Sequence, residues 1–163
     1  MIKRICLLGL ALVAVVALIV PSLFSSPASP GIAASATGNG ELTAFCGATR
    51  TFSFTAQRDS AGNATGNAQL VNHCNGVTTE TKINCLSVSG NVATMSGTIV
   101  SSNVDVLIGM DVWFRVADNG EGANAQSDQM TLALTSDPGT GPMCSEDIGL
   151  TLNRILSGNI QVH

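Results

Sequence analysis

Apolar and polar residues alternate along most of the chain from Leu42 onward, and this period of two constrains the fold more than any other feature. The longest such segment spans residues 104–117, where the even-numbered positions are apolar and the odd-numbered positions include Asp111 and Arg115. Successive side chains of an extended strand point to opposite faces, so alternation produces one buried face and one solvated face. Clusters of Gly, Asn, Asp and Ser separate the segments, as is typical of turns between strands. The sequence therefore predicts an all-β domain.

The connections between these segments are short, so neighbouring strands are expected to pair in chain order. The result is an antiparallel meander of about seven or eight strands. We predict a small up-and-down barrel, with a two-sheet β-sandwich as the alternative, because alternation alone does not determine whether the sheet closes.

Local patterns predict three details of strand pairing. The first hairpin is expected to place Phe52 opposite Leu70. The dipeptide Asn75-Gly76 is typical of a type I′ hairpin turn, in which both central residues have positive φ. Over residues 83–88 the apolar positions change from odd to even numbers, which predicts a β-bulge.

The N-terminal segment has the pattern of a secretory signal peptide. Lys3 and Arg4 precede an apolar run over residues 5–20, and small residues follow up to Ala34-Ser35-Ala36. The run of roughly 16 residues is shorter than the ~20 that a transmembrane helix needs, although an uncleaved anchor is the alternative. We predict a secreted or cell-surface protein with a signal peptide over residues 1–36, a flexible lead-in over 37–41 and a single β-domain over 42–163.

The charge of this domain excludes some classes of partner. Without Lys3 and Arg4 the chain has five basic and eleven acidic residues, a net charge of −6. A domain this acidic is not expected to bind nucleic acid. It is not expected to bind an anionic membrane surface either, so membrane association is predicted only if the N-terminal segment is retained as an anchor.

An even number of cysteines in a small exported domain predicts disulfides. The register of the first hairpin brings Cys46 and Cys74 to its open end on the same face, so we prefer this pair and assign Cys85 to Cys144. A metal site is the alternative, but no C-x-x-C occurs and His73 is the one histidine near a cysteine.

One candidate binding surface lies on the segment 104–117. Trp113, the sole tryptophan, falls on the predicted solvated face between Asp111 and Arg115. An exposed Trp can anchor a partner or a sugar ring, so we predict these three residues as a binding surface. Alternatively, a loop or a second sheet covers Trp113.

The loop over residues 118–128 is a candidate calcium site. It contains Asp118, Glu121 and Asp128, and Ca²⁺ prefers several oxygen ligands at one point. The spacing differs from that of an EF-hand, and Asp and Asn also stabilise turns by bonding to their own backbone. We therefore prefer a hairpin loop, with calcium as the alternative and no other cofactor expected.

The sequence contains no hydrolase or zinc-protease motif, and we assign no catalytic residue. His73 is a lone loop histidine, and Arg154 falls in the inward phase of the last segment, where it would need a carboxylate partner. We therefore expect a non-enzymatic binding or structural module. The alternative is a small enzyme or ligand carrier with a cavity inside a closed β-barrel.

Several segments resemble a family of uncharacterised secreted bacterial β-domains. The shared patterns are F-x-F-x-A at residues 52–56, G-x-x-Q-x-x-N at 66–72, V-x-G-N-x-A at 88–93 and V-x-D-N-G-E-G at 116–122. The resemblance extends from about Thr51 to the C-terminus. It implies one secreted β-domain and transfers no activity.

Overall fold

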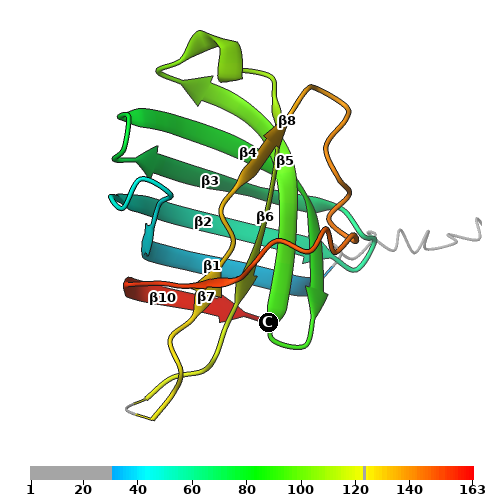
Figure 1. The fold of residues 1–163 in the computed structure, drawn as a ribbon. Helices are drawn as coiled ribbons and strands as arrows, with labels where there is room; N and C mark the ends of the chain where they lie inside the picture. Colours follow the sequence, from blue (N-terminus) through cyan, green and yellow to red (C-terminus); the bar gives the residue numbers. More distant parts are fainter. Residues whose placement is uncertain (1–30, 123) are drawn as a thin grey trace, which may run out of the picture.

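The computed structural model describes residues 31–122 and 124–163, which form one antiparallel sheet that curls into a half-barrel (Figure 1). The strands lie side by side in the order β10-β1-β2-β3-β4-β5-β6-β7-β9, and β8 pairs with β6 outside this path. The elements are β1 (Ile32–Thr43), β2 (Thr49–Asp59), β3 (Ala64–Asn72), β4 (Val77–Ser89), β5 (Val92–Ser102), the 3-10 helix η1 (Asp105–Leu107), β6 (Asp111–Ala117), β7 (Gln129–Met130), β8 (Leu134–Ser136), β9 (Asn153–Arg154) and β10 (Ser157–Val162).

The all-β prediction and the meander are confirmed for strands β1 to β7, which pair in chain order. The last strand, β10, returns to pair with β1, as it would in a barrel. The closed barrel is nevertheless wrong, and so is the two-sheet alternative. Strands β7, β8 and β9 contain only two or three residues each, so they do not continue the wall far enough to close it.

Most of the local pairing predictions are confirmed. Phe52 lies opposite Leu70, and the ladder between β4 and β5 has a bulge between Ile83 and Cys85. The chain also turns at Asn75-Gly76, but the predicted turn type is wrong. Only Gly76 has a positive φ, of 70°, because the connection is a four-residue loop rather than a two-residue turn.

Both predicted disulfides are present. Cys46 is bonded to Cys74 with a Cα–Cα distance of 6.1 Å, and Cys85 is bonded to Cys144 with a Cα–Cα distance of 5.8 Å. The first joins the β1–β2 and β3–β4 connections, whereas the second ties β4 to the segment that follows β8.

The predicted strand over residues 104–117 is correct only for β6. Residues 105–107 form η1, and Gly109, with φ of 91°, turns the chain back so that its N–H donates to the Ile99 carbonyl. Residues 103–109 consequently form the tip of the β5–β6 hairpin. Val106 and Ile108, which the alternation assigned to the core, are 76% and 50% exposed.

The sheet begins before the predicted start of the β-domain. Residues 37–41, expected to be a flexible lead-in, form the middle of β1, which is paired with β2 on one side and β10 on the other. Ala34 and Ala36, assigned to the signal peptide, belong to the buried core. The sequence pattern did not show this, because alanine and glycine provide little hydrophobic contrast along β1. Residues 1–30 lie outside the described part of the chain.

The core fills the inner face of the sheet. Phe54 and Phe114 meet there edge to face with ring centroids 5.8 Å apart, and Met95 is fully buried beside them in the same cluster. These side chains come from β2, β5 and β6, so the core joins strands that are distant in the sheet order. The opposite face is therefore the one on which ligand-binding side chains can lie.

Replacing Gly97 with alanine is expected to lower the free energy of unfolding by about 2–3 kcal/mol. A Cβ at this position would lie 2.1 Å from the Lys82 carbonyl oxygen at the bulge, so the β4 and β5 backbones would have to separate. Denaturant unfolding measures the loss. Gly31→Ala is the control, because nothing lies within 4 Å of its added Cβ; equal stability of the two variants would contradict this explanation.

Candidate functional site

The surface predicted around Trp113 is occupied by the chain itself. Trp113 is only 1% exposed, so the alternative in which another part of the chain covers it is the one that holds. Asp111, two residues before it, accepts hydrogen bonds from the Gly139 and Gly141 backbone N–H groups at 2.7 and 3.2 Å. The segment over residues 137–152 is therefore held against this face of β6 and crosses over it in Figure 1.

Two further interactions hold the same segment. Arg115 forms an ion pair with Asp147 at 2.6 Å, and the Cys85–Cys144 disulfide ties the segment to β4. The Gly149 N–H and the Arg115 guanidinium lower the pKa of the Asp147 carboxyl below its usual range. The stabilisation from this ionised form is thus present above the ordinary pKa and lost as the pH falls through the lowered value. Asp111 and Arg115, which were predicted to bind a partner, instead hold the segment over residues 137–152, and Trp113 lies beneath that segment.

The carboxylates of the predicted calcium loop bind the last strand. Ser35 and His163 exchange both backbone hydrogen bonds, so by alternation the N–H groups of Ile160 and Val162 point away from β1. Asp128, 5% exposed, accepts from Ile160 at 2.7 Å and from the Asn119 N–H at 2.8 Å. Asp118 accepts from Val162 at 3.1 Å. These two carboxylates cap the free edge of β10 and take the place of a neighbouring strand.

The remaining candidate residues do not gather at one site. Glu121 accepts a hydrogen bond from the Asn159 side chain at 2.9 Å, and His73 lies in the exposed β3–β4 loop. Arg154 is exposed on β9 rather than inward, because the buried position shifts to Ile155. Within residues 31–122 and 124–163, no group of three or more His, Cys, Asp or Glu side chains is placed to hold a metal ion.

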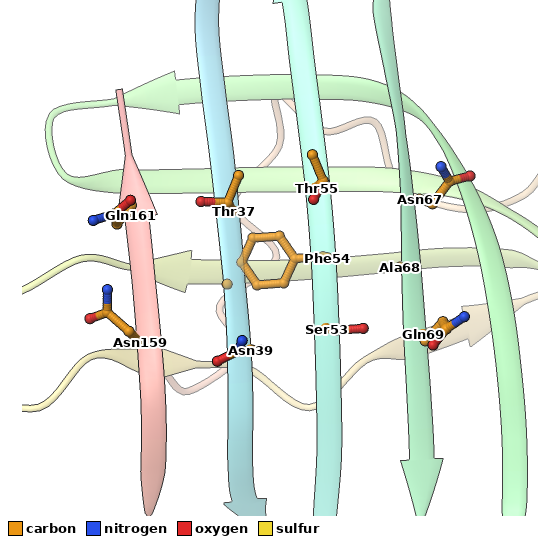
Figure 2. A pocket seen from close by; sticks show the side chains of 11 residues that line it. Thr37, Asn39, Ser53, Phe54, Thr55, Asn67, Ala68, Gln69, Asn159 and Gln161 are labelled. Carbon is orange, nitrogen blue, oxygen red and sulfur yellow. The ribbon is translucent and has the colours of Figure 1, made fainter.

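A polar groove on the outer face of β10, β1, β2 and β3 forms the candidate site (Figure 2). Its volume is about 550 Å³. Two rows of side chains cross the four strands, and the backbone between them, at Gly38, Phe54 and Ala68, forms the floor. We call this the amide groove. One row is Gln161, Thr37, Thr55 and Asn67, and the other is Asn159, Asn39, Ser53 and Gln69.

The concave shape follows from side-chain size. The second strand, β2, contributes the short hydroxyl side chains of Ser53 and Thr55, whereas β10 and β3 contribute the longer amides. The centre of the groove is consequently low and its two ends are high. Adjacent strands lie about 4.8 Å apart and the rows are two residues apart, so the groove is about 14 Å long and about 7 Å between rows.

Carboxylates outside the groove orient the amides at its two ends. Asn159 donates to Glu121 at 2.9 Å, and Gln69 donates to Glu80 at 3.1 Å, so each of these amides keeps its oxygen as an acceptor. In the described part of the chain, the side chains of Ser53 and Thr55 make no hydrogen bond to protein groups. The groove therefore presents both donors and acceptors, and none of its side chains is charged.

The amide groove was not predicted from the sequence, although the sequence contains a pattern that indicates it. The outward positions of residues 35–39, 53–57, 65–69 and 157–161 are all neutral and polar, in contrast to the charged outward positions of residues 111–115. A run of neutral polar residues on one face attracts little notice in a single strand. Only the pairing of β10 with β1 brings the four sets together.

A second concavity, of about 440 Å³, lies beside Phe45 and is also lined by Leu132 and Leu150. Phe45 is 94% exposed and directly precedes Cys46, so the disulfide fixes the loop that carries it. Its walls are more apolar than those of the amide groove and provide few hydrogen-bonding groups.

Comparison of the chain with known protein families, with curated proteins and with solved structures gave no match. Across residues 31–122 and 124–163, no helix has the length and apolar character needed to cross a membrane. The residues of the structure are therefore the basis for a functional proposal.

Proposed function

We propose that this chain is an exported, non-enzymatic binding module and that the amide groove holds a neutral, hydroxyl-rich ligand of the saccharide class. The observation that carries the proposal is the double row of eight uncharged hydrogen-bonding side chains across four adjacent strands. The two disulfides are consistent with an extracellular location, because disulfides persist in oxidising compartments.

The charge around the groove favours a neutral ligand. Glu80 and Glu121 lie next to its two ends. Lys82, which is paired with Asn67, lies beside one end, and no charged side chain is among the lining residues. A phosphate or carboxylate inside the groove would lose hydration without a charged partner among the lining residues, and the two neighbouring carboxylates outnumber the single Lys82 ammonium. The same reasoning disfavours nucleic acids and acidic polysaccharides.

The chemistry of the groove favours a ligand that is rich in hydroxyl groups over a ligand with an apolar surface. Amides and hydroxyls both donate and accept, and a sugar hydroxyl needs both kinds of partner. The partners recur at the strand spacing of about 4.8 Å, which suits a ligand whose hydroxyl groups recur along a chain. Apolar ligands would leave these groups desolvated and unpaired.

The alternative of an enzyme or ligand carrier with a cavity inside a closed barrel has less support. It requires an enclosed interior, whereas the sheet is an open half-barrel. Large side chains such as Met95 and Phe114 fill its inner face. No observation in the described residues favours a catalytic role for His73, which is exposed and contacts the Thr51 hydroxyl at 3.4 Å.

Ser53→Glu tests the proposal, because it adds a long charged side chain at the centre of the amide groove. We expect it to weaken binding of neutral hexasaccharides, such as cellohexaose, maltohexaose or chitohexaose, by about tenfold or more. Thr65→Glu is the matched control, because it introduces the same charge on the same face outside the groove. Calorimetric titration provides the affinities. An equal loss of affinity in both variants, or no binding of any of these sugars by the wild type, would contradict the proposal.

A further inference from the structure

We infer that the export signal is cleaved after Ala28, and that β1 belongs entirely to the exported domain. The inference rests on the structure of β1 and is independent of the proposed ligand. The A-x-A motif ending at Ala36 is a competing candidate cleavage site. Cleavage there would remove residues 32–36, which are the first five residues of β1.

The residues that would be lost are integral to the sheet. Ala34 is 5% exposed and Ala36 is fully buried, and both lie in the core cluster. Ser35 exchanges backbone hydrogen bonds of 2.8 and 2.9 Å with His163. Ala36 lies between Ala56 of β2 and Val162 of β10.

A domain that begins at Thr37 would leave these partners without a neighbour. The ends of β2 and β10 would lose their ladder hydrogen bonds to β1, and buried backbone groups without a partner are costly. Val162 would lose the cross-strand contact that covers it on this side. A product that retains residues 32–36 keeps both ladders complete.

The sequence upstream of β1 offers a suitable cleavage site. Ser26 and Ala28 provide small residues at the third and first positions before the cut, which is the requirement that the A-x-A pattern expresses. Ala28 lies four positions after Phe24, whereas Ala36 lies twelve positions after it and also follows a further large apolar residue, Ile32.

Intact mass and N-terminal sequencing of the full chain exported from a bacterial host test this inference. We expect the mature protein to begin at Ser29. A start at Thr37, a start at any other residue or retention of the N-terminal segment would overturn it.

Two variants make the test specific. Ala28→Leu replaces the small residue directly before the cut, so we expect the unprocessed chain to accumulate in the membrane fraction. Ser25→Leu is the control, because it lies outside the two small-residue positions, and normal processing is expected. Normal processing of Ala28→Leu would overturn the assignment even if both variants were secreted in reduced amounts.

Discussion

Replacing Asp128 with alanine is expected to lower the free energy of unfolding by about 3 kcal/mol. The carboxylate is buried and accepts hydrogen bonds from the backbone N–H groups of Ile160 and Asn119. Both bonds are charge-assisted, and the substitution would leave the donors without a partner at the free edge of β10. We therefore expect β10 to detach from the 118–128 loop before the rest of the sheet unfolds.

Denaturant unfolding and amide hydrogen exchange measure this effect. The Ile160 and Val162 amides should exchange faster in Asp128→Ala than in the wild type. Asp128→Asn keeps one acceptor oxygen and should show a smaller loss of stability. Asp137→Ala is the control, since the Asp137 side chain is exposed and makes no hydrogen bond within the described residues. If Asp128→Ala were as stable as Asp137→Ala, the carboxylate cap would have no structural role.

Removing the Cys85–Cys144 disulfide is expected to destabilise the domain by about 3 kcal/mol and to expose Trp113. The bond closes a loop with a sequence separation of 59 residues, and it acts together with the Asp111 hydrogen bonds and the Arg115–Asp147 ion pair to hold the segment 137–152 over β6. Without the bond, that segment can move away from the indole. Because Trp113 is the sole tryptophan, its fluorescence emission maximum should shift to longer wavelength as water reaches it.

The variant with both Cys46 and Cys74 replaced by alanine is the matched control. This bond closes a loop with a sequence separation of 28, so the chain-entropy difference between the two disulfides is only about 0.7 kcal/mol. Its loss should lower stability comparably and leave the emission of Trp113 unchanged in the folded state. An unshifted emission maximum in folded Cys85→Ala/Cys144→Ala would show that the disulfide does not hold the cover in place.

The strands with strong hydrophobic contrast could be predicted from the sequence. Phe52 and Phe54 alternate with hydroxyl residues, and this pattern was sufficient for the register that pairs Phe52 with Leu70. The bulge near Ile83 was predictable because it changes the numbering of the apolar positions. The Cys46–Cys74 disulfide followed from the same register.

The features that were not predicted depend on contacts between residues that are distant in the sequence. Alternation placed Trp113 on the outer face correctly but could not show that residues 137–152 return to cover it. It also continued through Val106, where a 3-10 turn interrupts the strand. Short-range patterns likewise give no indication that β10 pairs with β1, and the amide groove exists only because of that pairing.

Binding of a neutral saccharide in the amide groove is the main functional prediction. Titration of ¹⁵N-labelled protein with cellohexaose, maltohexaose or chitohexaose, followed by two-dimensional NMR, tests it most directly. We predict that at least one of these sugars shifts the amide resonances of Thr37, Asn39, Ser53 and Asn67 and the side-chain amides of Gln69, Asn159 and Gln161. Absence of shifts with all three, or shifts confined to the surface around Phe45, would contradict the claim.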